Sequence, residues 1–197
     1  MLERELKAVV ADPEVIKARL TAAGALVQFR GQMADRRFDR ADELAARDEV
    51  LRVREYRGTD GSIDIQVAWK GPTTVEAGYK IRDEHEFGVV GAEGLARVMA
   101  ALGYRPVHAI DRYVECYGVA EAVVRLEWYP RMDVLMEVEG PAGAIEQAVA
   151  LLGVAREAYH TDALAAFVGR YEIRTGQRAA VSLAELGPDR PSWEALR

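Results

Sequence analysis

Glu3-Arg4-Glu5-Leu6-Lys7 is the stretch of sequence that decides the fold. Charged side chains occupy every second position, while apolar residues such as Leu6 and Ala8 largely fill the positions between them. Because side chains alternate between the two faces of a β-strand, this spacing predicts a strand with charge on one face only. The same period-two pattern of charge returns further along the chain, at Arg52/Arg54, at Lys80/Arg82/Glu84/Glu86 and at Glu137/Glu139.

The order of the predicted elements favours a single antiparallel sheet, because short turns separate most of the predicted strands. Helices are predicted after Asp12-Pro13, over 92–102, after Gly140-Pro141 and over 159–171, where apolar residues recur at helical spacing. The other strands are predicted over 26–39, 50–56, 63–70, 79–89, 108–117, 122–129 and 133–139. Eight antiparallel strands can close a barrel, so we predict an α+β fold: an eight-stranded antiparallel β-barrel, or tunnel, with helices packed outside.

The direction of the charged faces has two possible interpretations. Alternation alone favours charge on the outside, because a charged strand face is usually solvated. Charge faces inward only if the apolar faces are needed for packing against helices on the outside. The sorting of the charges favours this second arrangement, since carboxylates gather in one group and cations in another. The carboxylates are Glu3, Glu5, Glu84, Glu86, Glu127, Glu137 and Glu139, and the cations are Lys7, Arg52, Arg54, Lys70, Lys80, Arg82 and Arg112.

Composition limits the classes of protein to consider. The chain has 197 residues, which suits one domain, and 29% of them are charged, as in a folded protein. The net charge of −6 and the lack of a lysine-rich run argue against a nucleic-acid binder. No apolar run approaches the length of a membrane span, and the first residues do not resemble a signal peptide. The single Cys116 agrees with a reducing compartment, so we expect a cytoplasmic protein.

An inward arrangement would bring like charges together and would therefore require ligands. Two carboxylates about 4 Å apart repel by about 4 kcal/mol at an effective dielectric constant near 20. A divalent cation would relieve this repulsion, and carboxylate oxygens are the ligands that Mg²⁺ and Mn²⁺ prefer. The arginines and lysines would in turn require an anion. A polyphosphate satisfies both halves, because its oxygens bind both guanidinium groups and metal ions.

These residues resemble those of a known family. Glu3-x-Glu5-x-Lys7 is similar to the ExExK signature of the CYTH domain, the fold of the triphosphate tunnel metalloenzymes. The likeness continues in the same order over 1–171, which would be the tunnel domain, with 172–197 as a peripheral C-terminal tail. The further matching motifs are Leu51-Arg52-Val53-Arg54, Lys70-Gly71-Pro72, Lys80 to Glu86, Arg112, Glu137-Val138-Glu139-Gly140 and the late Tyr159.

The resemblance implies a role for each group of residues. The implied metal ligands for Mg²⁺ or Mn²⁺ are Glu3, Glu5, Glu137 and Glu139. The implied triphosphate-binding residues are Lys7, Arg52, Arg54, Lys70, Lys80, Arg82 and Arg112. The implied catalytic set, which would hold a second metal or orient water, is Glu84, Glu86 and Glu127, together with Lys7. Glu127 departs from the aspartate that many relatives carry, and Asp111 stands where relatives often have lysine.

The resulting functional hypothesis is a metal-dependent phosphohydrolase that acts on inorganic or organic triphosphates. One alternative is a class IV adenylyl cyclase, which converts ATP to cyclic AMP and pyrophosphate with the same grip on the triphosphate. Hydrolysis is favoured because a water molecule needs less positioning than a ribose hydroxyl. A second alternative is a sensor that binds a nucleotide or polyphosphate without turnover. The expected partner is a small molecule that contains a triphosphate, with no nucleic acid and no membrane, and the apolar outer faces make a homodimer possible.

Overall fold

The computed structural model describes residues 2–188 and residue 193. The strands are β1 (Leu2–Val9), β2 (Leu26–Asp39), β3 (Val50–Gly58), β4 (Ile63–Lys70), β5 (Thr74–Glu76), β6 (Tyr79–Gly88), β7 (Arg105–Val119), β8 (Ala122–Trp128) and β9 (Leu135–Glu139). The helices are α1 (Pro13–Ala22), α2 (Ala92–Ala101), α3 (Ala142–Leu152) and α4 (Leu164–Thr175), with 3₁₀ turns at Ala45–Arg47, Arg156–Ala158 and Leu183–Leu186. None of the helices in this described part of the chain is long and apolar enough to cross a membrane.

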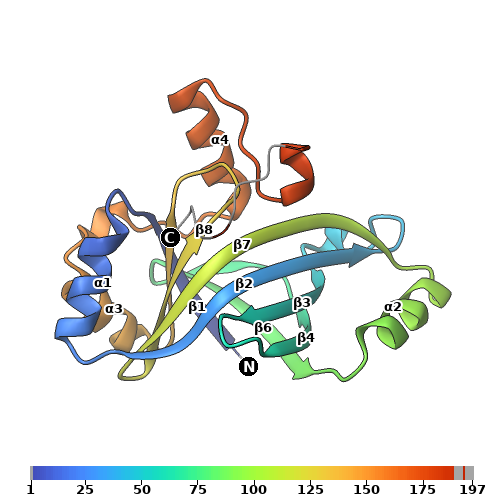
Figure 1. Cartoon of the computed structure of the whole chain (residues 1–197), viewed down its shortest axis with the longest axis horizontal. Helices are drawn as coiled ribbons and strands as arrows, with labels where there is room; N and C mark the ends of the chain where they lie inside the picture. The colour runs from blue at the N-terminus through green and yellow to red at the C-terminus, as the bar shows by residue number, and fades with distance from the viewer. Residues whose placement is uncertain (1, 189–192, 194–197) are drawn as a thin grey trace.

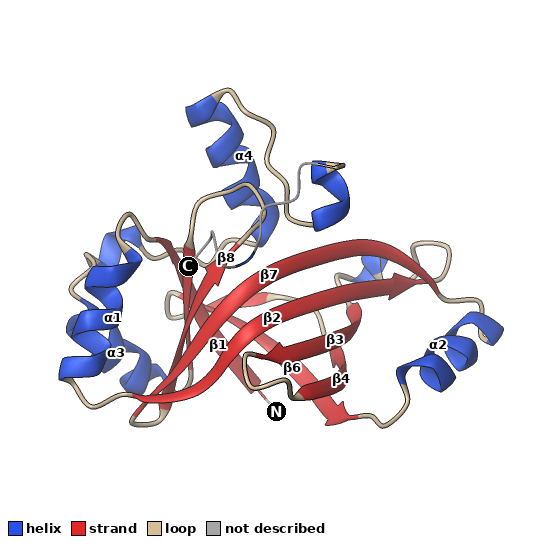
Figure 2. Ribbon diagram, in the orientation of Figure 1, coloured by secondary structure: helices blue, strands red, loops and turns tan. Residues whose placement is uncertain are grey.

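The strands form a closed antiparallel barrel (Figure 2). Its eight strands follow the order β1-β9-β8-β7-β2-β3-β4-β6, and β6 returns to pair with β1. Glu3 lies opposite Arg82 in this closing pair, while Glu5 lies opposite Glu139 on the other side of β1. The short strand β5, which the sequence did not predict, pairs with the first residues of β6. The predicted eight-stranded antiparallel barrel with external helices is therefore confirmed.

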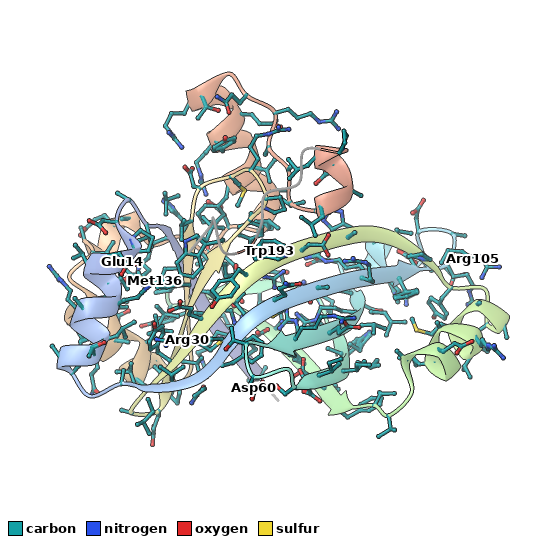
Figure 3. All side chains as sticks on the ribbon, viewed as in Figure 1. Glu14, Arg30, Asp60, Arg105, Met136 and Trp193 are labelled. Atoms are coloured by element: carbon teal, nitrogen blue, oxygen red, sulfur yellow. The ribbon has the colours of Figure 1, made fainter. Side chains whose placement is uncertain are left out.

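The apolar core lies outside the barrel, between the strands and the helices. Leu6 of β1, Leu126 of β8 and Val138 of β9 have no exposed surface and pack with Ile145 of α3 and Leu20 of α1. Figure 1 shows α1 and α3 side by side against one flank of the barrel, and Met136 lies on that flank in Figure 3. The apolar faces of these strands are thus used for helix packing, which leaves their charged faces to point inward.

Local sequence signals set the start of α1 but not of α4. Asp12 caps α1, since its Oδ1 accepts hydrogen bonds from the backbone N–H groups of Glu14 (3.0 Å) and Val15 (3.3 Å). The fourth helix, predicted over 159–171, instead begins at Leu164 and ends at Thr175. The residues before it are extended because His160 pairs with Lys7 through two backbone hydrogen bonds of 2.9 and 2.7 Å. This pairing continues the edge of β1 beyond Glu5, where its pairing with β6 ends.

The segment after α4 folds back onto the barrel. Ala180 pairs with Arg131, and the backbone N–H of Asp111 donates to the carbonyl of Val181 (2.8 Å). Ser182 caps the 3₁₀ turn at Leu183–Leu186, close to the short helical piece predicted there. Within the predicted tail of 172–197, residues 189–192 and 194–197 lie outside the described part of the chain.

Candidate functional site

A cavity of about 270 Å³ occupies the interior of the barrel. All fourteen candidate site residues from the sequence line it, together with others, so that nine acidic and nine basic side chains face one space. The acidic side chains are Glu3, Glu5, Asp35, Asp48, Glu84, Glu86, Glu127, Glu137 and Glu139. The basic ones are Lys7, Arg37, Arg52, Arg54, Lys70, Lys80, Arg82, Arg112 and Arg125. The charges point into the barrel, as the inward interpretation of the sequence predicts.

Three of the four predicted metal ligands converge. One carboxylate oxygen from each of Glu3, Glu5 and Glu139 lies within 4.8 Å of the others, and these three residues are called the carboxylate trio below. Burial raises the pKa of Glu3, and repulsion from Glu5 adds to this rise. Burial also holds the pKa of Glu139 well above its usual value. Such a set of hard oxygen donors, costly to keep charged alone, fits Mg²⁺ or Mn²⁺.

Glu137, the fourth predicted ligand, lies outside this trio. It forms an ion pair with Lys7 across the β1–β9 pair and another with Arg125 on β8. Burial raises the pKa of Glu137, but the charges of Lys7 and Arg125, together with hydrogen bonds to this carboxylate, outweigh burial and bring the pKa well below its usual range. The same pairing raises the pKa of Lys7 despite its burial. Glu137 is therefore held as a charged partner of two cations.

The predicted catalytic carboxylates also have cationic partners. Arg52 donates from Nη2 to Glu84 (3.1 Å) and Glu86 (2.9 Å). Glu127 accepts from Arg112 Nε (2.9 Å) and from the hydroxyl of Tyr129 (2.6 Å). These bonds fix the orientation of the three carboxylates within the cavity.

The three lysines of the predicted phosphate-binding set all form ion pairs with the carboxylate trio, and Lys7 lies 2.8 Å from Glu5. Lys70 lies 2.6 Å from Glu3 and 3.1 Å from Glu84, and Lys80 lies 2.6 Å from Glu5. The attraction of Lys7 and Lys80 keeps the pKa of Glu5 lowered although burial opposes this. Glu3 and Glu5 are thus paired with lysines, whereas Glu139 is paired with Arg125 at 3.1 Å.

The predicted phosphate-binding arginines differ in their partners. Arg54 binds Asp35 through two hydrogen bonds of 2.7 and 2.9 Å, and Arg112 reaches the same carboxylate at 3.1 Å. Arg82 instead donates from Nε to the carbonyl of Gly71 (2.6 Å) and from Nη2 to the carbonyl of Asp48. Arg82 therefore also ties the 71–73 loop to the start of β3.

Sequence reasoning missed several residues of the site. Asp35 and Arg37 on β2, and Arg125 and Tyr129 at β8, all line the cavity. The available signal was spacing, because Asp35 and Arg37 are two residues apart, and Arg125 and Tyr129 each lie two residues from Glu127.

A second chamber of about 330 Å³ adjoins the first. Tyr56, Arg125 and Glu139 line both chambers. Phe29 adds a second aromatic ring, with its centroid 5.0 Å from that of Tyr56 in an edge-to-face contact. Buried polar atoms without a hydrogen-bond partner in the described structure include Arg125 Nε and Gln66 Oε1, on two residues that line this chamber. The second chamber therefore offers an aromatic wall together with unused polar atoms.

Comparison with solved structures supports the fold. A comparison with protein-family models finds no match, and neither does a comparison with curated protein sequences. A putative adenylate cyclase from Vibrio parahaemolyticus aligns with a TM-score of 0.73 and 16% identity, over 86% of this chain and 98% of that one. The PH1012 protein from Pyrococcus horikoshii OT3 aligns with a TM-score of 0.67 and 19% identity, over 84% of this chain and 98% of that one.

A third similar structure is HpAC1 from Hippeastrum, a putative adenylyl cyclase described as having a dominant triphosphatase activity. It aligns with a TM-score of 0.59 and 15% identity, over 89% of this chain and 96% of that one. The closed barrel and these alignments confirm the fold that the resemblance to the CYTH domain implies, a tunnel of eight antiparallel strands.

Proposed function

We propose that the tunnel is the active site of a divalent-metal-dependent enzyme that processes triphosphates, and that it acts as a phosphohydrolase on inorganic or organic triphosphates. The observation that carries this proposal is one cavity in which a buried carboxylate trio lies beside a wall of cations. A triphosphate bound to Mg²⁺ or Mn²⁺ has the complementary pattern of charge. The similarity to HpAC1, described as having a dominant triphosphatase activity, supports the same proposal.

In this proposal Glu3, Glu5 and Glu139 would hold the metal. A divalent ion held there would supply neutralising charge for the phosphate oxygens and would activate water for attack. The chain itself binds and orients the substrate: Arg54 and Arg112 present guanidinium groups to the phosphate oxygens, and the low-dielectric interior strengthens each of these bonds.

The remaining carboxylates are placed to orient the attacking water molecule. Glu127 is held by Arg112 and by the hydroxyl of Tyr129, so its position in the cavity is fixed before substrate enters. Fixed acceptors of this kind contribute to catalysis because they need no reorganisation when the nucleophile approaches. Glu84 and Glu86, which share Arg52, are placed for the same role or for a second metal.

A class IV adenylyl cyclase is the second candidate, and the second chamber favours it. Cyclisation requires a fixed nucleoside, and the ring wall of Phe29 and Tyr56 adjoins the cavity with the carboxylate trio. The putative adenylate cyclase of Vibrio parahaemolyticus has the same fold. A sensor without turnover would share the binding residues but give no product.

The test incubates the purified protein with Mg²⁺ or Mn²⁺ and, separately, with inorganic triphosphate, thiamine triphosphate or ATP. Products are resolved by ³¹P NMR and nucleotide chromatography. Orthophosphate release supports the hydrolase, cyclic AMP with pyrophosphate supports the cyclase, and metal-dependent binding without products supports the sensor. Glu5→Ala is expected to abolish turnover, whereas the exposed Glu93→Gln on α2 is the matched control. Unchanged turnover in Glu5→Ala would contradict the site assignment.

A further inference from the structure

The cations of the first chamber are almost all neutralised by carboxylates. Eight of its nine basic side chains lie within 4.0 Å of an acidic oxygen in the described structure. Arg37 is the exception, because among the described residues it forms neither an ion pair nor a side-chain hydrogen bond. Each of the other cations already has a carboxylate partner, although the Nε atoms of Arg52 and Arg125 have no hydrogen-bond partner in the described structure. An anion that enters the tunnel can bind the whole guanidinium group of Arg37 without displacing a carboxylate.

The surroundings of Arg37 are positively charged. Arg37 lies opposite Arg52 in the β2–β3 pair, and it is partly buried in the first chamber. Burial lowers the pKa of Arg37, and the charges of Arg52, Arg112 and Arg82 lower it further, while Asp35 opposes them. Several guanidinium groups therefore act on one region of the cavity. A phosphate group with two negative charges would relieve this repulsion.

Arg37 also lies far from the second chamber. Phe29, near the start of β2, lines the second chamber, whereas Arg37, near the end of β2, lines only the first. Eight residues of extended strand separate them, which corresponds to about 26 Å along the strand. Glu139 of the carboxylate trio lines both chambers. The tunnel therefore has an aromatic end and an arginine end, and one member of the carboxylate trio, Glu139, lies where the two chambers meet.

We propose that Arg37 binds the terminal phosphate of the substrate and thereby sets the direction in which a triphosphate lies in the tunnel. The terminal phosphate points to Arg37, and the opposite end of the chain points to the second chamber of Phe29 and Tyr56. A triphosphate is then long enough to reach Arg37 from an anchored organic group, but a diphosphate ends short of it. This inference rests on the proposed function for the identity of the ligand.

The chain provides a matched control in the neighbouring residue. Arg36 points to the other face of β2, where it forms an ion pair with Asp111 at 2.8 Å. Arg36→Gln and Arg37→Gln remove the same charge from adjacent positions, one outside the tunnel and one inside. Because Arg37 has no ion pair to lose in the described structure, Arg37→Gln is expected to leave the melting temperature unchanged.

The experiment measures binding by titration calorimetry, with inorganic triphosphate, ATP and ADP, in the presence of Mg²⁺. Arg37→Gln is expected to weaken the binding of inorganic triphosphate and ATP by about 10- to 100-fold, the value of a charged hydrogen bond, and that of ADP by less than about threefold. Arg36→Gln is expected to change none of the three. Equal losses for ATP and ADP, or no loss at all, would overturn the proposal.

Turnover separates this inference from the proposed function. A wild-type protein that binds triphosphate without hydrolysing it contradicts the hydrolase but leaves the role of Arg37 intact. A wild-type protein that hydrolyses triphosphate, together with an Arg37→Gln variant that binds it normally, contradicts only the role of Arg37. A wild-type protein that binds no triphosphate contradicts both.

Discussion

The variant Asp35→Asn tests how much the buried ion pairs inside the barrel contribute to the free energy of unfolding. The Asp35 side chain is almost completely buried, with 3% of its residue surface exposed. It accepts two hydrogen bonds from Arg54, at 2.7 and 2.9 Å, and one from Arg112 at 3.1 Å. Its removal leaves two buried guanidinium groups without this partner. We expect the free energy of unfolding to fall by about 3–5 kcal/mol, which is the usual cost of breaking a buried ion pair.

Urea denaturation measures this loss directly. With a slope of about 2 kcal/mol per molar urea, the midpoint should fall by about 1.5–2.5 M. Glu93→Gln is the control, because Glu93 and Arg97 form an exposed ion pair on α2 whose loss should cost less than about 0.5 kcal/mol. A loss below about 1 kcal/mol in Asp35→Asn would refute the reasoning, since it would mean that water reaches and solvates these arginines.

The pH dependence of the same pair has a definite sign. Burial raises the pKa of Asp35, but the charges of Arg54 and Arg112 outweigh burial and hold it well below its usual value of 3.8. The pair therefore contributes its full stability above pH 3.8, and the contribution is lost as the pH falls through the lowered value. The difference in stability between wild type and Asp35→Asn should be constant near neutral pH and shrink only in strong acid.

Three further predictions concern the proposed activity. Arg54→Ala should weaken the binding of inorganic triphosphate by about tenfold or more in calorimetry, because a charged hydrogen bond is lost; unchanged binding and rate would contradict the inward-facing site. Burial raises the pKa of Glu139, so the affinity for Mn²⁺ should increase with pH by up to about tenfold per pH unit. The Glu139→Gln variant should show a weaker dependence of affinity on pH. A wild-type affinity that does not change with pH would contradict this prediction. Phe29→Ala should lower kcat/KM for ATP by about tenfold and leave that for inorganic triphosphate within about twofold, whereas equal losses would exclude an organic subsite in the second chamber.

Much of the fold could be predicted because the signals are local. A period of two in charge marks β1, β3, β6 and β9, and the cap at Asp12 marks the start of α1. The start of α4 could not be predicted in this way. The backbone of His160 is extended because it pairs with Lys7, which lies more than 150 residues earlier. The sequence around His160 contains no local signal for such a distant contact.

The sequence predicted which residues line the cavity, but not which of them lie opposite or pair with one another. Period two places Glu137 and Glu139 on the same face, so the sequence gives them the same predicted role. The β1–β9 register separates them, because Glu139 lies opposite Glu5 whereas Glu137 lies opposite Lys7. Glu139 therefore joins the carboxylate trio and Glu137 pairs with Lys7, while both glutamates also pair with Arg125. The register between two strands that are distant in the sequence depends on how the whole barrel closes. This register cannot be deduced from the local pattern of a single sequence.

The balance of nine acidic and nine basic side chains has a consequence for how the proposed ligands would bind. A triphosphate alone would have to take Arg54, Lys70 and similar groups away from carboxylates that would then remain buried and unpaired. A divalent metal alone would have to take carboxylates from lysines in the same way. When both bind, the metal takes the carboxylates and the phosphates take the cations, so each ligand removes the cost that the other would incur. Metal and triphosphate should therefore increase each other's affinity by the same factor, as linkage requires for a cavity whose charges are paired before either ligand arrives.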